Sequence, residues 1–163
     1  MFFYIIWNKV LTIIIKPSQI DQYLGHEPEP TKWHTVTQEQ INQFADCTLD
    51  HQYIHVDPLK AKESLFGTTI AHGFLSVSLL SHFAEEFSLV IDGCYMGINY
   101  GFDRLRFISP VKVDSRIRAR AKYLEISAKK PGQFDFKVEV TIEIEHSKRP
   151  ALVCEWLCRQ MVK

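Results

Sequence analysis

The sequence predicts a single α+β domain in which an antiparallel sheet wraps around one long buried helix. Two patterns carry this prediction. Residues 70–87 are apolar around most of a helical circumference, which is typical of a helix buried on all sides. Residues 116–123 and 134–145 instead alternate charged and less polar side chains. Alternation with a period of two residues, which leaves one face exposed to solvent, is typical of strands in an antiparallel sheet.

The length and composition fit an ordinary globular domain. The chain has 163 residues, of which 46% are hydrophobic and 12% aromatic, as expected for one folded domain rather than a disordered chain. Lys plus Arg equals Asp plus Glu at 19 each, so the broad positive field of a nucleic-acid-binding protein is missing. None of the four cysteines forms a Cys-x-x-Cys pair, which argues against a zinc ribbon or redox motif. We therefore expect a cytoplasmic protein.

Residues 1–16 form an apolar extension ahead of the domain proper, which we expect over residues 17–163. Asn8 and Lys9 interrupt the apolar run, and a bilayer span needs about 20 continuous apolar residues. The run also lacks the basic leader and small-residue cleavage site of a secretory signal. We expect a poorly specified extension, or a strand or helix packed on the domain, with a membrane anchor as the weaker alternative.

Short helices are predicted before the long one. Residues 37–40 read as a capping box, which opens a helix with its apolar face inward. Residues 46–55 are polar and lack an apolar stripe, so we predict a loop there. Asp57 and Pro58 then provide a cap and a first-turn proline for a second short helix that stops before Gly67.

The remaining strands complete a sheet of about five. Residues 95–107 predict a strand interrupted at Gly101, residues 130–132 a turn, and residues 151–162 a last strand. A single wrapped sheet of this size leaves open edges, and pairing two copies would cover them. We therefore expect a homodimer.

The densest polar cluster of the chain spans residues 50–57. Asp50 and His55 are five residues apart, and a turned loop can bring such a carboxylate and imidazole into one small volume. The pair could hold a water molecule and move two protons. Two alternatives remain open here: His55 could be a structural histidine bonded to a loop carbonyl, or His51, His55 and Asp57 could bind a metal. Pro58 disfavours the helix that such a metal site would need.

A second cluster begins the long helix. Gly73 lies in its first turn, where backbone N–H groups have no intrahelical partner and carry partial positive charge. Such donors can stabilise a developing oxyanion, although the glycine could equally serve close helix–sheet packing. Ser78 follows five residues later, where its hydroxyl either bonds back to a helix carbonyl or lines a site.

Two stretches of this sequence resemble the MaoC-like dehydratases, a family that includes the (R)-specific enoyl-CoA hydratases. They are Asp50-x-x-x-x-His55 and, after Phe66-Gly67, Ala71-His72-Gly73-Phe74-Leu75-Ser76-Val77-Ser78. The sequence from Asp50 to Pro58 is most similar to the NodN-like branch, as are residues 98–101 and 104–107. The resemblance covers roughly residues 17–160. It implies a hot dog fold, in which an antiparallel sheet wraps a long central helix, and a homodimer.

The resemblance also implies the roles of individual residues. Asp50 and His55 match the catalytic aspartate and histidine of the family. The residues expected to bind substrate are Gly73, Ser78, Gln52 and His72. The hydratase signature usually reads Asp-x-Asn-Pro-x-His, and this chain has Gln52 and Tyr53 at its asparagine and proline positions.

The activity implied is the reversible addition of water to a trans-2-enoyl thioester, giving a (R)-3-hydroxyacyl thioester. The thioester already activates the alkene, so we expect no metal and no cofactor, and coenzyme A would enter as part of the acyl-CoA substrate. Two alternatives are an acyl-CoA thioesterase on the same fold, which would direct water at the carbonyl carbon, and a non-catalytic acyl-thioester-binding protein.

Overall fold

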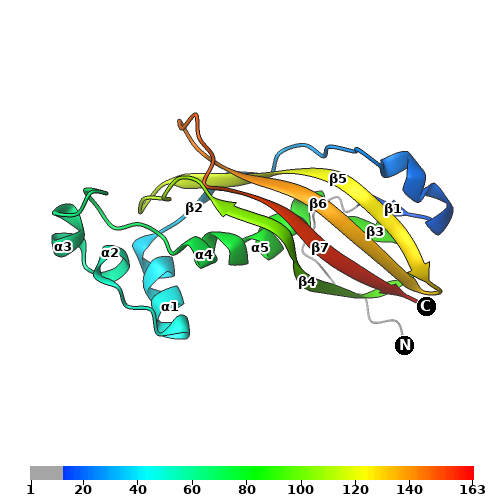
Figure 1. The fold of residues 1–163 in the computed structure, drawn as a ribbon, viewed down its shortest axis with the longest axis horizontal. Helices are drawn as coiled ribbons and strands as arrows, with labels where there is room; N and C mark the ends of the chain where they lie inside the picture. The colour runs from blue at the N-terminus through cyan, green and yellow to red at the C-terminus, as the bar shows by residue number, and fades with distance from the viewer. Residues whose placement is uncertain (1–12) are drawn as a thin grey trace.

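The computed structural model describes residues 13–163 as a curled sheet with a helical segment projecting from one end (Figure 1). The elements before the long strands are β1 (Ile13–Ile15), the 3-10 helix η1 (Pro17–Tyr23), β2 (His34–Thr35), α1 (Gln38–Thr48), α2 (Tyr53–Val56), α3 (Pro58–Lys62), α4 (Gly73–Ser78), α5 (Leu80–Phe87) and β3 (Leu89–Ile91). The long strands are β4 (Cys94–Phe107), β5 (Arg116–Lys130), β6 (Gln133–Ile144) and β7 (Leu152–Val162).

The main sheet has five strands in the order β2-β5-β6-β7-β4, and every neighbouring pair is antiparallel. The sheet curls over α4 and α5, while α1, α2 and α3 lie beyond its end (Figure 1). The antiparallel α+β architecture expected from the sequence is therefore confirmed. It leaves the outer edge of β4 without a strand partner in the described part of the chain.

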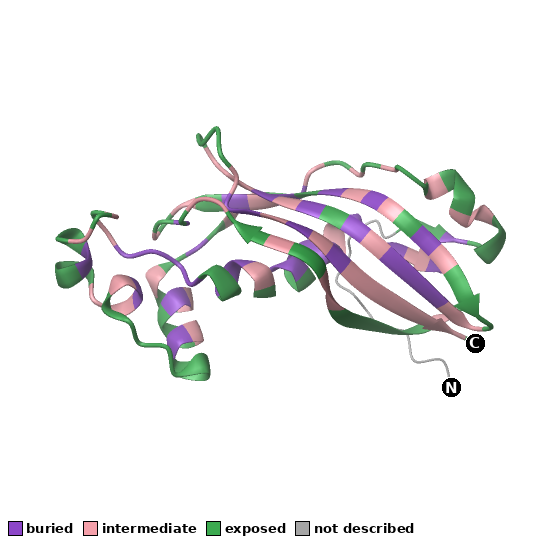
Figure 2. Cartoon of the chain, in the orientation of Figure 1, coloured by how far each residue is buried: buried purple, intermediate pink, exposed green. Residues whose placement is uncertain are grey.

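Alternation along the strands builds the core. On β5, Ile117, Ala119 and Ala121 are buried while the residues between them face outward, and Figure 2 shows the same alternation on the neighbouring strands. The inward face meets Phe83 of α5, which is fully buried. Tyr123 joins the two layers: its hydroxyl donates to the carbonyl of Phe87 (3.1 Å) and accepts from the N–H of Leu89 (2.8 Å).

Gly132 makes the predicted turn between β5 and β6 possible. Its φ of +71° is strained for a residue with a side chain, and a Cβ there would lie 2.7 Å from the carbonyl oxygen of Val162. The predicted interruption of β4 is also present, because the pairing with β7 shifts register between Asn99 and Gly101.

The long helix differs from its prediction in two ways. It begins at Gly73 instead of residue 70, and it is divided at Leu79 into α4 and α5. The delay has a tertiary cause, because the N–H of Ala71 donates to the carbonyl of Val111 (2.7 Å) and Ile70 bridges to Lys112. The helix is also not buried on all sides, since Phe74 is 66% exposed.

The loop predicted over residues 46–55 is partly wrong. Helix α1 continues to Thr48, whose hydroxyl donates to the carbonyl of Phe44 (2.7 Å), and it ends at Leu49 in the left-handed region (φ 62°). Four residues later the chain forms α2. Local polarity did not reveal α2 because its one buried residue, His55, bonds to the carbonyl of the distant Ile70.

The end of the apolar N-terminal segment forms a strand. Residues of β1 pair in parallel with β3, and Ile15 is 1% exposed. The rest of the predicted extension, residues 1–12, lies outside the described residues. Within residues 13–163, no helix is long and apolar enough to cross a bilayer.

The central position of Phe83 leads to a stability prediction. Replacing this fully buried ring with alanine should lower the free energy of unfolding by about 3–5 kcal/mol, because the sheet cannot close over the cavity. Urea unfolding followed by circular dichroism, at one protein concentration, measures the change. His82→Ala, on the exposed side of the same helix, is the control and should shift stability by less than about 0.5 kcal/mol. Equal effects of the two substitutions would contradict the packing described here.

Candidate active site

Caps at the helix ends shape the segment that carries the candidate residues. The hydroxyl of Thr37 accepts from the N–H of Gln40 (3.2 Å) and starts α1, which is one half of the predicted capping box. The other half is not formed, because the side-chain oxygen of Gln40 pairs with the ring of His34 (3.1 Å). Asp57 accepts from the N–H of Lys60 (3.1 Å) and starts α3. Asp50 and His55 lie in the chain between these two caps.

His55 is held by one ring nitrogen, and the other makes no hydrogen bond to the described residues 13–163. Its Nδ1 lies 2.7 Å from the carbonyl oxygen of Ile70. Because a carbonyl only accepts, Nδ1 carries the proton, and Nε2 of the neutral ring is an acceptor. The side chain is 7% exposed, and burial is the main cause that lowers the pKa of His55. The sequence left open whether His55 is structural or catalytic; its Nδ1 makes the structural bond and leaves Nε2 available for chemistry.

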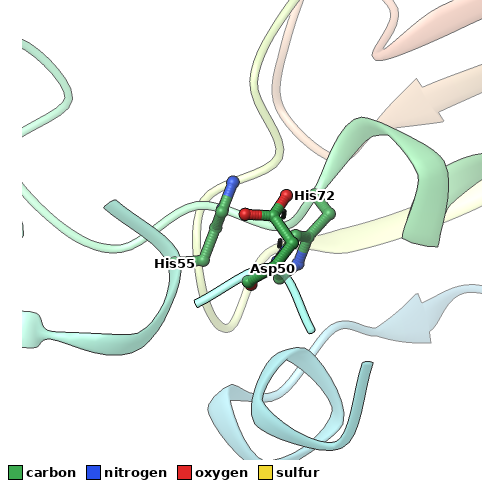
Figure 3. Close-up of side chains that lie close together, drawn as sticks. All are labelled: Asp50, His55 and His72. Atoms are coloured by element: carbon green, nitrogen blue, oxygen red, sulfur yellow. Dashed lines mark hydrogen bonds and ion pairs between the residues drawn. The ribbon is translucent and has the colours of Figure 1, made fainter. Parts of the chain in front are cut away.

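The carboxylate of Asp50 reaches the same place from the end of α1. Single polar atoms of Asp50, His55 and His72 all lie within 4.8 Å of one another, and Figure 3 shows the carboxylate turned toward the His55 ring. The side chain of Asp50 is 55% exposed, and its Oδ1 accepts weakly from the N–H of Gln52 (3.4 Å). A water molecule with two hydrogen bonds can bridge groups at this spacing.

His72 lies behind this pair and is 3% exposed. Its ring stacks on that of His55 with 3.8 Å between centroids and 24° between planes. Its Nε2 lies 2.9 Å from the main-chain carbonyl oxygen of Asp50. The structure therefore places His72 beneath the two candidate catalytic residues, and its predicted contact with substrate stays a prediction.

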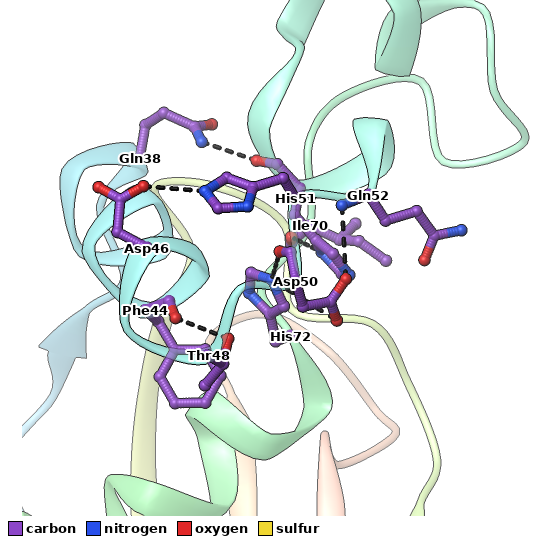
Figure 4. A network of polar contacts seen from close by, with 10 residues as sticks. Gln38, Phe44, Asp46, Thr48, Asp50, His51, Gln52, Ile70 and His72 are labelled. Atoms are coloured by element: carbon purple, nitrogen blue, oxygen red, sulfur yellow. Dashed lines mark hydrogen bonds and ion pairs between the residues drawn. The ribbon is translucent and has the colours of Figure 1, made fainter.

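Gln38 holds the main chain of His55 from the start of α1. Its side-chain N–H donates to the carbonyl of His55 (2.7 Å), and its oxygen accepts from the hydroxyl of Thr69. Figure 4 shows the bond donated by the Gln38 side chain within the polar network around the site. Sequence reasoning placed Gln38 in a capping box and missed this role, because both partners are far away along the chain.

The other predicted substrate-binding residues lie around the pair in different ways. Gly73 directly follows His72 as the first residue of α4, and a Cβ there would lie 2.9 Å from the Phe107 ring. Ser78 donates to the carbonyl of Phe74 (2.8 Å), which is the first of the two alternatives for this hydroxyl. Gln52 caps α2, and its side chain is directed away from Asp50 (Figure 4).

The structure does not bring together His51, His55 and Asp57, the three residues considered from the sequence as metal ligands. The Nε2 of His51 is bonded instead to a carboxylate oxygen of Asp46 at 2.9 Å (Figure 4), and Asp57 is engaged with Lys60.

The trio of Asp50, His55 and His72 has metal-like spacing, but its geometry does not fit a metal ion. The stacked rings direct their lone pairs along nearly parallel planes, and Nε2 of His72 donates to a carbonyl. Ligand lone pairs have to converge on the ion in a tetrahedral site. We therefore treat Asp50 and His55 as an acid–base pair.

Comparison with known proteins shows the family to which the chain belongs. Residues 19–146 match the family described as MaoC like domain. The chain belongs to the MaoC-like dehydratase family. It is 48% identical to nodulation protein N of Rhizobium leguminosarum bv. viciae over 90% of this chain and 89% of that protein. It is 42% identical to 3-hydroxyacyl-thioester dehydratase Z of Mycobacterium tuberculosis H37Rv over 83% and 89% of the two chains.

Solved structures of MaoC-like proteins have the same fold. The (R)-hydratase of A. caviae involved in PHA biosynthesis superposes with a TM-score of 0.68 at 22% identity, covering 83% of this chain and 94% of that one. The MaoC-like dehydratase of Rhodospirillum rubrum gives 0.70 at 18% identity, covering 88% and 96%. The expected family, its NodN-like character, the hot dog fold and the class of dehydratase and hydratase enzymes are confirmed.

Proposed function

We propose that this protein adds water reversibly to a trans-2-enoyl thioester and forms a (R)-3-hydroxyacyl thioester. One observation supports the proposal most directly: a half-exposed carboxylate of Asp50 and a ring nitrogen of the buried imidazole of His55 lie within 4.8 Å. This spacing suits a water molecule held between two acceptors. The thioester substrate class is that named in the Mycobacterium tuberculosis relative.

The chemistry needs a hydrogen-bond acceptor for each O–H of the water molecule, and one of the two acceptors also takes a proton. The carboxylate of Asp50 and Nε2 of neutral His55 each accept one O–H of that water. As the oxygen bonds to C3 of the enoyl group, Asp50 takes the proton that leaves the water. The pair then delivers a proton to C2 on the same face. The hydroxyl of the water therefore ends on C3 and its proton on C2, and Asp50 and His55 return to their starting protonation states.

Negative charge develops on the thioester oxygen as C3 is attacked. We assign its stabilisation to the N–H of Gly73, because the first N–H groups of a helix lack intrahelical partners. One such donor contributes about 2.7–4 kcal/mol to an oxyanion transition state. The thioester itself activates the alkene, so coenzyme A acts as the carrier of the substrate and the proposed reaction uses no further cofactor.

Variants of the acid–base pair test this proposal. Asp50→Asn and His55→Ala should each lower the hydration of crotonyl-CoA by at least about 10²-fold, because each removes one acceptor for the water. Loss of the enoyl absorbance measures hydration, and a thiol reagent measures any hydrolysis of the thioester.

Asp46 and His51 provide a matched control. They are also a carboxylate and an imidazole five residues apart, but they pair with each other at the surface. Asp46→Asn and His51→Ala should keep hydration within about twofold, since surface pairs of this kind contribute little. Near-native turnover of Asp50→Asn would contradict the roles proposed here. Thiol release without hydration would instead indicate a thioesterase, and tight thioester binding without turnover a binding protein.

The pKa of His55 predicts how the activity depends on pH. Burial lowers this pKa, so the neutral ring that accepts from water should persist below the ordinary histidine value of about 6.5. The kcat/KM for crotonyl-CoA should therefore stay level from neutral pH downward and fall only with a midpoint below about 6.5. Circular dichroism over the same range controls for unfolding. A midpoint at or above about 6.5 would contradict the burial argument.

We also propose that two copies of this chain pair through the edge strand β4. Its outer edge faces no other described strand, and most of its residues are exposed. The large apolar side chains exposed on this strand are Tyr95, Met96, Ile98, Tyr100 and Phe107. Phe107 continues the apolar surface onto α4 through an edge-to-face contact with exposed Phe74 (5.8 Å). When the β4 edges of two copies pair with each other, neither copy is left with an open edge on this side of the sheet.

Light scattering after size exclusion tests the dimer. The protein should have twice the 19.0 kDa mass of one chain, and Ile98→Lys should convert it to the monomer, because a lysine on an edge strand opposes pairing. Leu65→Lys is the control: Leu65 is 89% exposed but lies beyond α3, so the dimer should persist. A monomeric native protein, or an unchanged dimer in Ile98→Lys, would contradict the proposal.

A further inference from the structure

We propose that His72 is a positioning residue for the acid–base pair, because a single buried ring holds both Asp50 and His55 in place. The inference rests on the proposed hydratase activity and extends it to a side chain that does not touch the reacting atoms. It follows from three separate features of the ring: its packing, its hydrogen bond and its unpartnered nitrogen.

The ring of His72 packs against two other aromatic rings. The His55 ring stacks on it with 3.8 Å between centroids, and the ring of Phe44 from α1 is 5.1 Å away. The side chain of His72 is 4% exposed. His72 thus transmits the position of α1 to the His55 ring, and it excludes water from the face of His55 that it covers.

The hydrogen bond of His72 goes to the residue that carries the carboxylate. Nε2 lies 2.9 Å from the carbonyl oxygen of Asp50, and a carbonyl can only accept, so Nε2 carries the proton. The bond ties Asp50 to the residue just before α4, across 22 positions of the chain. The nearer carboxylate oxygen of Asp50 is 4.0 Å from the same nitrogen, which leaves the carboxylate free to face His55.

The second nitrogen of His72 shows that packing alone does not explain this residue. Nδ1 is buried and has no hydrogen-bond partner among residues 13–163. A buried polar atom without a partner costs about 1–3 kcal/mol, which a phenylalanine or leucine at this position would avoid. What the histidine adds over an apolar ring is the single donor to Asp50.

The same ring shapes the surroundings of His55. The titratable side chains beside His55 are Asp50 and His72, with opposite effects on its protonation, and burial is the largest cause of its lowered pKa. Since the His72 ring provides part of that burial, its position bears on the geometry of the pair as well as on the protonation of His55.

Two polar substitutions separate the donor from the rest of the side chain. The amide of His72→Gln can reach the place of Nε2, whereas the amide of His72→Asn reaches only the place of Nδ1. Asn is also well tolerated at this position ahead of a helix. His82→Asn, at an exposed site on α5, controls for the substitution itself.

Crotonyl-CoA kinetics give the first readout. His72→Asn should lower kcat by about 10²-fold with KM within about twofold, because a shift of about 1 Å in a catalytic group has that effect. The kcat of His72→Gln should be at least about tenfold higher than that of His72→Asn. A raised KM with unchanged kcat in both variants would overturn the inference and make His72 a substrate contact, as the sequence predicts. An unchanged kcat in His72→Asn would overturn it as well.

Amide hydrogen exchange of residues 49–56 gives a readout that does not depend on activity. Exchange in this segment should be faster in His72→Asn than in the native protein, and close to native in His72→Gln. If the native protein does not hydrate crotonyl-CoA, the proposed function fails while this comparison still decides the role of His72. If His72→Asn does not fold, His72→Phe replaces it as the donor-free variant. Loss of folding in both, or equal exchange in all variants, would overturn the inference.

Discussion

The site depends on the hydrogen bond from Nδ1 of His55 to the carbonyl of Ile70 (2.7 Å). The N–H of Ile70 in turn donates to the carbonyl of Ile54 (3.0 Å), so residue 70 is bound to α2 in both directions. This link joins the helical segment beyond the sheet to the chain that enters α4. It also decides the chemistry, because the proton on Nδ1 leaves Nε2 of the neutral ring as an acceptor.

The segment between β4 and β5 holds that link in place. The N–H of Ala71 donates to the carbonyl of Val111, and the N–H of Val113 donates to the carbonyl of Thr69. Residues 69–71 are therefore held by the strand-like segment 111–113, and helix α5 anchors the other end of the region through the buried ring of Phe83. Catalytic groups have to be held within about 0.5 Å of their working geometry. A short helical segment bonded to the chain between two strands of the sheet in this way can meet that demand, whereas a free loop cannot.

Much of the fold was predictable because its patterns are local. The alternation of β5 and β6, the turn at Gly132 and the cap at Thr37 depend on neighbours along the chain, and all are present. The start of the long helix at residue 70 was wrong because a bridge to Lys112 holds Ile70 in an extended backbone. The loop assigned to residues 46–55 was partly wrong for a similar reason, since the turns of α2 are held by Gln38 and Ile70.

By itself the sequence determined the chemical types at the site and their order: a carboxylate, an imidazole five residues later and a glycine at a helix start. Those residue types and spacings are properties of the chain and need no contact to be read. Only the tertiary structure decided that Asp50 and His55 face one another, which nitrogen of His55 is free, and that His72 lies beneath both. Each of these depends on hydrogen bonds and stacking between segments 15 to 28 residues apart, and such contacts leave no periodic pattern in the sequence.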